Sequence, residues 1–409
     1  MITDRFEVPS KLKTTGLVLL LAGVAALIGG AVSLLGGSEH DQAHFWIVLL
    51  QNSVFFLFIT AASIFIQAAS GLAQAGWIVA YRRIPEAIGA NVWIFGLIAL
   101  VVLFSIVFGL GDHNPIYHWV AGGKDHAGNI IDEVIAGKST FLNKYMFAGF
   151  SIAAVGFWSF FGRKFRAMSI AQETAPKNST KIYWRMVALS GAFLFVYALT
   201  MMSTIPWFWI MSIDAHWYST LFSWYVFASS FVSGMSLIML WTIYLKNRGN
   251  LEFVTKEHMH DLGKFMFAFS IFWTYLWFSQ FMLIWYGNMP EETTYFKIRM
   301  QGPYATFFWF NLVLNFLCPI LILMSRPSKR NYFLVVFIAF VIIFGHWIDF
   351  YVMTMPGPLQ ENWHLGWYEL GILLGFAGVL ILSVSKTLSK ANLVPENNVF
   401  LKETIIHVS

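Results

Sequence analysis

Cysteine and charged residues are both scarce in this sequence of 409 residues. Its one cysteine, Cys318, lies inside an apolar run. A single cysteine excludes an intrachain disulfide, a cysteine-held iron–sulfur cluster and a CxxCH haem attachment. Charged residues make up 11% of the chain, whereas a soluble domain carries about 25%. The chain therefore has too little charge for a soluble domain.

Apolar residues take the place of the missing charge. Hydrophobic residues make up 58% of the chain and the mean hydropathy is +0.64, which is typical of a polytopic membrane protein. Aromatic residues reach 18%, and we interpret most of them as lipid-facing and interfacial side chains. The net charge of +5 indicates basic inner loops rather than a nucleic-acid partner. The first apolar run is long, so we expect a retained first span rather than a cleaved signal peptide.

Ten apolar runs are each long enough to cross a bilayer, which takes about 20 residues. They predict an all-α integral membrane protein with ten transmembrane helices, a single polytopic domain over residues 1–409. The predicted spans are about 14–36, 45–69, 91–111, 144–162, 184–206, 219–245, 264–286, 304–325, 332–354 and 367–386.

Lysine and arginine are unevenly divided between two alternating sets of connecting segments. One set holds only Lys124, Lys138, Lys144, Lys297 and Arg299, which leaves 21 of the 26 basic residues in the set that includes both termini. Because basic loops stay on the inner side of a membrane, this bias places both termini in the cytoplasm. The alternation also supports the count of ten spans, since one missed helix would disturb it.

Ionisable residues gather near the outer ends of the predicted spans. His346 and Asp349 are three residues apart in the ninth span and so share a helix face. Asp349 lies about 8 Å inside the helix end, and an ionisable residue at that depth is costly and usually faces a bundle interior. Asp214 and His216 precede the sixth span, and Glu369 opens the tenth. A carboxylate near an imidazole can take a proton from a quinol hydroxyl and relay it, so these five residues are the candidates for proton transfer or quinone binding.

A structural role is the alternative for the same residues. His346 and Asp349 could be a buried pair that locks two helices together, and Asp214 and His216 could be solvated loop residues. The cytoplasmic halves of the spans show few buried acids, which disfavours a full transmembrane proton channel.

Two adjacent glutamates, Glu291 and Glu292, follow the seventh span on its outer side. We expect them to lie after a helix C-terminus, where the helix dipole disfavours anions, so that they need a partner. Arg299 or a basic residue of another subunit is the candidate partner. These three residues are therefore a predicted interface.

Histidine placement argues against a haem held by this chain. Axial ligation of a haem within the membrane needs histidines inside the spans, and His346 is the one histidine well inside a span. No cluster of His, Cys and carboxylate residues has the spacing of a metal site. If the chain takes part in redox chemistry, we expect the electron carriers to lie on other subunits.

Three sequence blocks carry a resemblance to a known family. They are SIDAHWYSTLFSWYVFAS (212–229), FSQFMLIWYGNMPEETTYFKIR (278–299) and HWIDFYVMTMP (346–356). Together with the ten spans, they resemble the NrfD/polysulfide-reductase-type membrane subunits over about residues 15–390. Within that family they are most similar to the second such subunit of bacterial alternative complex III.

The resemblance implies a membrane subunit of a respiratory quinol:cytochrome c oxidoreductase in the bacterial cytoplasmic (inner) membrane. Its fold would be two four-helix bundles, spans two to five and six to nine, flanked by spans one and ten. Menaquinol would be the reductant, and Gln280 and Trp285 are the candidates for a quinone pocket. Haems and iron–sulfur clusters would lie on partner subunits. The implied partners are a multihaem cytochrome c subunit, an iron–sulfur subunit, a second and larger NrfD-like subunit, small membrane anchors and lipids, with cytochrome c or a terminal oxidase as electron acceptor.

Two other functions compete with this interpretation. The chain could be a non-catalytic scaffold of the same complex, with quinol oxidised in the sister NrfD-like subunit. It could also be a secondary transporter, but transporters often show internal repeats and paired Gly/Pro interruptions near the membrane midplane, which this sequence lacks. Loss of turnover in an assembled complex would separate a catalytic role from a scaffold role.

Overall fold

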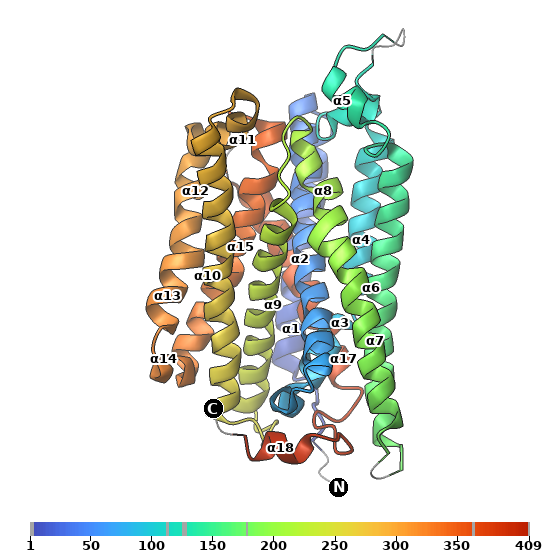
Figure 1. The fold of residues 1–409 in the computed structure, drawn as a ribbon, viewed down its shortest axis with the longest axis vertical. Helices are drawn as coiled ribbons and strands as arrows, with labels where there is room; N and C mark the ends of the chain where they lie inside the picture. Colours follow the sequence, from blue (N-terminus) through green and yellow to red (C-terminus); the bar gives the residue numbers. More distant parts are fainter. Residues whose placement is uncertain (1–3, 112–113, 125–128, 177–178, 362–364, 408–409) are drawn as a thin grey trace.

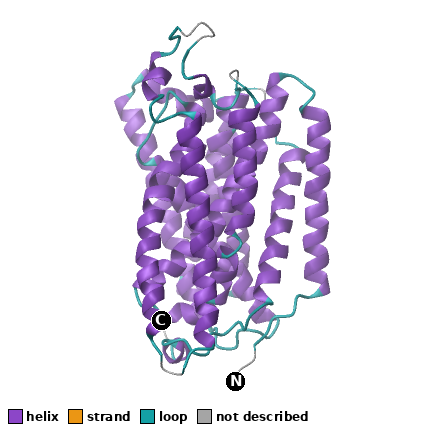
Figure 2. Cartoon of the chain, turned by 90° about the vertical axis from the view of Figure 1, so that its right-hand side faces the viewer, coloured by secondary structure: helices purple, strands orange, loops and turns teal. Residues whose placement is uncertain are grey.

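The computed structural model is an elongated bundle of helices that run roughly parallel to its long axis (Figures 1 and 2). It describes residues 4–111, 114–124, 129–176, 179–361 and 365–407, and within these ranges it contains helices and loops but no β-strand. The longer α-helices are α1 (Ser10–Leu34), α2 (Glu39–Leu72), α4 (Val92–Phe104), α6 (Lys144–Glu173), α7 (Lys181–Leu199), α9 (Phe222–Asn247), α10 (Lys256–Gly287), α11 (Pro290–Met300), α12 (Ala305–Leu312), α15 (Tyr332–Thr354) and α17 (Trp367–Leu388). The shorter ones are α3 (Arg83–Gly89), α5 (Glu133–Lys138), α8 (Ile205–Trp209), α13 (Cys318–Leu323), α14 (Arg326–Arg330), α16 (Pro356–Leu359) and α18 (Leu401–Ile405).

The prediction of ten membrane-crossing helices is confirmed for the described residues. Ten helical segments are long and apolar enough to span a membrane: Ser10–Leu34, Glu39–Leu72, Arg83–Gly109, Lys144–Glu173, Lys181–Trp209, Phe222–Asn247, Lys256–Gly287, Gly302–Leu323, Tyr332–Thr354 and Trp367–Leu388. Each overlaps one predicted span. The largest difference is in the fourth segment, predicted to end at 162, because the helix continues through the polar residues up to Glu173. The chain is therefore an all-α, multi-pass membrane protein.

Helices α2 and α9 form the centre of the bundle. The most apolar window of α2 is 100% buried and that of α9 is 94% buried, whereas no other segment exceeds 56%. The two helices pack closely, since a Cβ added to Gly234 of α9 would lie 2.9 Å from the Cβ of Ala62 in α2. A helix that is apolar on all sides belongs in a core, so these two helices provide the surface on which the others pack.

Glycines allow α1 and α17 to pack with their backbones in contact. A Cβ added to Gly23 of α1 would lie 2.2 Å from the Cα of Gly375 in α17, and one added to Gly378 would lie 2.5 Å from the backbone nitrogen of Leu20. Small residues let membrane helices approach in this way, so that van der Waals contact and not the hydrophobic effect holds them together.

We therefore expect Gly23→Leu to separate α1 from α17 and to lower the midpoint of thermal unfolding in detergent. Overpacking of this kind costs about 1–3 kcal/mol. The matched control is Gly191→Leu in α7, where an added Cβ meets nothing within 4 Å. Equal midpoints for the two variants would show that the close contact contributes nothing to stability.

Both chain termini lie at the same end of the bundle, the lower end in Figure 1, which we call the terminus end. Few acidic residues are buried near this end, as the sequence indicated, and among the described residues they are Glu86 and Asp261. Glu86 of α3 is fully buried and forms ion pairs with Arg82 at 2.9 Å and Arg83 at 2.8 Å. Arg83 also pairs with Glu173 of α6. The acid is tolerated because two arginines neutralise it, and the cluster ties α3 to α6.

Candidate functional site

Asp349 is the centre of a polar cluster inside the bundle. It lies five residues before the end of α15, and its side chain is fully buried. Helix α15 starts where the side chain of Asn331 caps the backbone N–H groups of Phe333 and Leu334. The residues that follow are almost all apolar up to Asp349, which is the single carboxylate of this helix. The predicted interior position of Asp349 is what the structure shows.

Three side chains from three other helices donate hydrogen bonds to the Asp349 carboxylate. The Trp273 indole of α10 donates to Oδ2 at 2.9 Å. The Asn311 amide of α12 donates to Oδ1 at 2.8 Å, and the Tyr225 hydroxyl of α9 donates to the same oxygen. A deprotonated carboxylate can only accept hydrogen bonds, so all three partners suit that form. The cluster joins four helices through one side chain.

His346 lies one turn before Asp349 and completes the cluster. Its Nδ1 is 2.9 Å from the Ser229 hydroxyl and 3.6 Å from Asp349 Oδ2. The second distance is too long for a hydrogen bond but is close enough for a proton to pass after a small shift. The other ring nitrogen, Nε2, is buried and has no hydrogen-bond partner among the described residues. A buried polar atom without a partner is costly and needs a reason, which an exchanging proton or a water molecule would supply.

A π-helical turn brings a second amide toward the cluster. The segment η7 (Val313–Leu317) continues α12, and its Asn315 donates to Asn311, which in turn donates to Asp349. The Asn315 oxygen occupies the space beside Gly345 where a Cβ would lie only 2.3 Å away. Single π-helical turns inside α-helices are frequent at functional sites. Here the turn extends the hydrogen-bonded chain by one residue.

A small cavity adjoins the cluster on the side away from the terminus end. Its volume is about 30 Å³, and its polar lining comes from Tyr225, Gln280, Asn311 and Arg299. That is room for a water molecule with several polar partners. It is far below the ~300 Å³ at which small-molecule sites begin. Gln280, predicted to contact a quinone, therefore lines a cavity that fits water and not a quinone ring.

Arg299 is held by the acid that follows α8 rather than by the glutamates predicted as its partners. Its Nη2 is 2.8 Å from the carboxylate of Asp214, and the arginine is 1% exposed. Its other donors bind the backbone carbonyls of Tyr295, Val352 and Met353 at 2.9–3.0 Å. The sequence placed Asp214 and Arg299 in separate groups because they are 85 positions apart in the chain. The structure brings them together at the outer wall of the small cavity.

Aromatic rings cover the Arg299 guanidinium. Its Cζ lies 3.4 Å from the ring centroid of Tyr295, which itself stacks on Trp217 at 3.8 Å. Burial raises the pKa of the Tyr295 phenol, so this ring stays neutral and presents its face to the cation. The stack covers the Arg299 side of the Arg299–Asp214 pair, while the Asp214 side chain stays 19% exposed. Tyr295 also lines the small cavity.

Glu291 and Glu292 follow the C-terminus of α10, as predicted, but they also lie in the first turn of a new helix. Helix α10 ends at Gly287, Asn288 after it has a left-handed backbone at φ 46°, and α11 begins at Pro290 with both glutamates in its first turn. The dipole of α11 therefore favours these anions. Glu291 is exposed and Glu292 is half-buried, and the N-terminus of α11 stabilises both without an internal cation.

Glu369 forms a separate cluster with the second membrane segment. Its carboxylate is 2.5 Å from the His44 ring nitrogen of α2 and accepts the backbone N–H of Gly366 at 2.9 Å. The side chain is fully buried and caps the start of α17. No described hydrogen bond or ion pair connects it to Asp349. Its contacts thus tie α17 to α2.

We expect Glu369→Ala to loosen the first turn of α17, because His44 and the Gly366 N–H both lose their acceptor. Leaving such groups unsatisfied costs about 1–3 kcal/mol. Hydrogen exchange should therefore become faster in the backbone amides that follow Gly366. The control is Glu292→Ala, which removes a half-buried acid of α11, and equal protection of α17 in both variants would contradict this role.

His216 is paired at the surface and stays outside the Asp349 cluster. Its ring nitrogen is 2.6 Å from Asp132, and its side chain is 60% exposed. The backbone N–H of Ile135 and the bond to His216 lower the pKa of Asp132. The pair fixes the loop that contains α5. The five residues predicted for proton transfer or quinone binding thus lie in three separate places instead of one.

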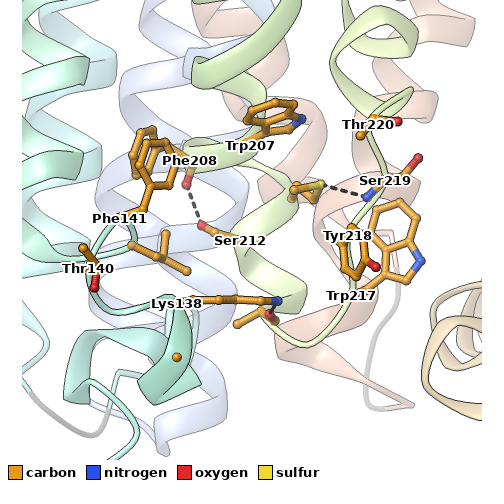
Figure 3. A pocket seen from close by; sticks show the side chains of 14 residues that line it. Lys138, Thr140, Phe141, Trp207, Phe208, Ser212, Trp217, Tyr218, Ser219 and Thr220 are labelled. Atoms are coloured by element: carbon orange, nitrogen blue, oxygen red, sulfur yellow. Dashed lines mark hydrogen bonds between the residues drawn. The ribbon is translucent and has the colours of Figure 1, made fainter. Parts of the chain in front are cut away.

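A larger cavity lies beside the same loop, with a volume of about 370 Å³ (Figure 3). Phe141 and Phe208 stand on one side of it and Trp217 and Tyr218 on the other. Lys138 crosses its edge to donate to a backbone carbonyl at 2.6 Å, and burial lowers the pKa of this lysine. The size and aromatic lining are those of sites for small organic molecules.

Trp285, the other predicted quinone contact, points away from both cavities. Its side chain is 68% exposed on α10, and it does not line either cavity. Such a tryptophan near a helix end has the position of an interfacial anchor.

Sequence reasoning alone did not single out Tyr225, Ser229, Trp273 or His44. Each has a polar group that could have been noticed, since Tyr225 and Ser229 are four residues apart on one helix face. In an aromatic-rich membrane chain, however, tyrosine and tryptophan are too frequent for their position to mark a site.

The fold and this buried cluster define a multi-pass α-helical membrane protein with a polar centre near one end. Comparison of the sequence with protein-family models and with curated proteins finds no match. Among the described residues, no three His, Cys, Asp or Glu side chains are grouped as metal ligands would be.

Proposed function

We propose that this chain is a membrane subunit of a respiratory quinol:cytochrome c oxidoreductase and transfers protons through the Asp349 cluster. The subunit it would correspond to is the one called ActF in alternative complex III. A single observation carries the proposal: a buried carboxylate, with a buried imidazole 3.6 Å away, adjoins a water-sized cavity. Ionisable groups at membrane depth are usually functional.

A hydrogen-bonded route supports proton transfer toward the bundle surface. Asp349 contacts Tyr225 and Asn311, and both line the small cavity. On its far side the cavity is lined by Arg299, which pairs with the 19%-exposed carboxylate of Asp214. A water in the cavity would link the two acids, and Arg299 would hold the charge at the exit. The matching positions of the family, Asp214 and Asp349, are thus the two ends of one route.

A quinone bound by this chain near the Asp349 cluster would not fit the small cavity but would have room in the 370 Å³ cavity. A bound quinol would supply electrons to haems or iron–sulfur clusters on partner subunits. As the electrons leave, the quinol must release the protons of its hydroxyl groups. The 370 Å³ cavity has room for a ring, and the Ser212 hydroxyl faces its lining. Trp217 lines this cavity, and Tyr295 lines the small one. The two rings stack on each other, so they form the wall between the two cavities.

The arrangement of helices agrees with the proposed family fold. Helix α2 contacts α3, α4 and α7, while α9 contacts α10 and α15, and α1 packs along α17. The contacts of α2 and α9 with these helices lie within the two four-helix bundles that we propose, while α2 and α9 also contact each other between them. The basic bias of the loops favours a cytoplasmic terminus end, which places Asp349, Arg299 and Glu291 toward the periplasm.

The scaffold function rests on a different observation. Glu291 is exposed and Glu292 is half-buried in the first turn of α11, at the tip of the bundle where a partner subunit would contact them. In that case quinol would be oxidised in the sister subunit, and the Asp349 cluster would serve only to hold four helices together.

Purification through an affinity tag on this chain tests the assignment to a respiratory complex. We expect a multihaem cytochrome and an iron–sulfur protein to co-purify, with quinol:cytochrome c activity in the same fraction. A chain that purifies alone from mild detergent, without haem absorbance, would contradict the assignment.

A further inference from the structure

A second feature of the molecule lies on the outer faces of α4 and α6, at the right-hand edge of Figure 1, far from the Asp349 cluster. A groove of about 570 Å³ runs between the two helices. Its α4 side is formed by Trp93, Leu97 and Leu100, which are spaced to share one helix face. The groove is long enough for a lipid chain, since Ile152 and Ala167, the first and last α6 residues that line it, are about 22 Å apart along the helix.

Two basic residues close the groove at the end nearer the terminus end. Arg163 and Lys164 line it, and both are exposed. In the part of the chain that the structure describes, neither makes an ion pair with a carboxylate, and Arg163 lies over the Trp93 ring at 5.7 Å. Two unneutralised cations at one end of an apolar groove form an amphipathic site.

The position of these cations along α6 matches the edge of a bilayer. Lys144 at the start of α6 and Lys164 are 20 residues apart, which is about 30 Å of helix and the thickness of the hydrocarbon core. Arg163 and Lys164 therefore lie at headgroup level when Lys144 lies at the opposite surface. The groove extends from them into the hydrocarbon.

One polar atom in the groove has no protein partner. Ser159 is 6% exposed, and its hydroxyl makes no hydrogen bond to any described residue. It lies one turn from Arg163 on the groove wall. Its oxygen is buried behind that wall, and a rotation of the Ser159 side chain would bring it to the ester or glycerol oxygen of a lipid.

We propose that this groove binds one anionic phospholipid from the leaflet at the terminus end. In this site Arg163 and Lys164 contact the phosphate, and Ser159 contacts the glycerol region. One acyl chain packs on the helix face formed by Trp93, Leu97 and Leu100. The site is independent of the Asp349 cluster and of the quinol assignment.

Native mass spectrometry of the full-length, detergent-solubilised chain tests the proposal by titration with phosphatidylglycerol and phosphatidylcholine. At about 1 kcal/mol for each basic residue near an anionic surface, we expect phosphatidylglycerol to bind about 30-fold more tightly. Arg163→Gln/Lys164→Gln should remove this preference. The control Lys181→Gln/Arg185→Gln, two exposed cations of the same end on α7, should keep it.

Two further arms separate a lipid from its headgroup alone. Gly156→Leu should fill the groove, since an added Cβ there meets nothing within 4 Å, and should weaken binding of both lipids. Glycerol phosphate without acyl chains should bind far more weakly than the lipid. Equal affinity for the two lipids, an unchanged preference in the Arg163/Lys164 double variant, or equally tight binding of glycerol phosphate would overturn the proposal. The first of these results would instead favour an acidic protein partner as the occupant.

Discussion

Asp349→Asn is expected to lower quinol:cytochrome c turnover of the assembled complex by about 100-fold or more, the usual scale of general acid–base catalysis. Asparagine has the size of aspartate but cannot take up a proton. Its amide group would also face donors, because Trp273 donates to one carboxylate oxygen and Asn311 and Tyr225 to the other. Turnover should be normalised to haem content, and subunit stoichiometry measured beside it.

The control for this variant is Glu292→Gln, which removes a half-buried acid of α11 from the same end of the molecule. It should leave turnover per complex unchanged. Normal turnover in an intact Asp349→Asn complex would favour the scaffold function and move the quinol chemistry to the sister subunit. Loss of the complex itself is distinguished from loss of chemistry by the stoichiometry.

Arg299→Met is expected to lower the free energy of unfolding by about 3–5 kcal/mol, which is the cost of leaving a buried charge without its partner. Asp214 would lose its cation, and the carbonyls of Tyr295, Val352 and Met353 would lose their donor. Arg299→Lys should recover little of the lost free energy of unfolding, because an ammonium group lacks the planar, forked set of donors that reaches these acceptors. Thermal unfolding in detergent, followed by tryptophan fluorescence, measures the effect.

The double variant Arg299→Met/Asp214→Leu shows whether the ion pair is responsible. Removing both charges together should recover part of the stability, since no isolated charge then remains. If the double variant is as unstable as the sum of the two single variants, the loss comes from the backbone contacts and not from the pair.

Local sequence patterns predicted the ten membrane-crossing helices well, because such a helix can be recognised from the length and apolarity of its sequence alone. The pairing of His346 with Asp349 was equally local, since three residues of spacing on one helix put both on one face. What the sequence could not supply was the partner of each group. Tyr225, Trp273 and Asn311 come from three other helices, and their meeting at Asp349 depends on how the bundle packs.

The glutamates after α10 show a different source of error. The segment from Met289 to Glu292 contains a proline followed by two acids, which is a helix-start signal. We expected the two glutamates to feel only the C-terminal dipole of the preceding helix, because its apolar run ends at Gly287. The structure places a new helix directly after the turn, which reverses the sign of the dipole felt by Glu291.

Burial also separated residues that the sequence had grouped. Asp214 and His216 are two residues apart, yet Asp214 turns inward to Arg299 and His216 outward to Asp132. Irregular backbone around the η5 segment (Met211–Asp214) makes this divergence possible. No periodicity applies in such a loop, so spacing could not assign the two side chains to one site.

The most direct test of the account is infrared difference spectroscopy of the purified complex as quinol reduces it. A protonation change at Asp349 should give a carboxyl C=O band that is present in the native complex and in Glu292→Gln but absent from Asp349→Asn. A spectrum without such a band, or a band that persists in Asp349→Asn, would contradict proton transfer by this cluster.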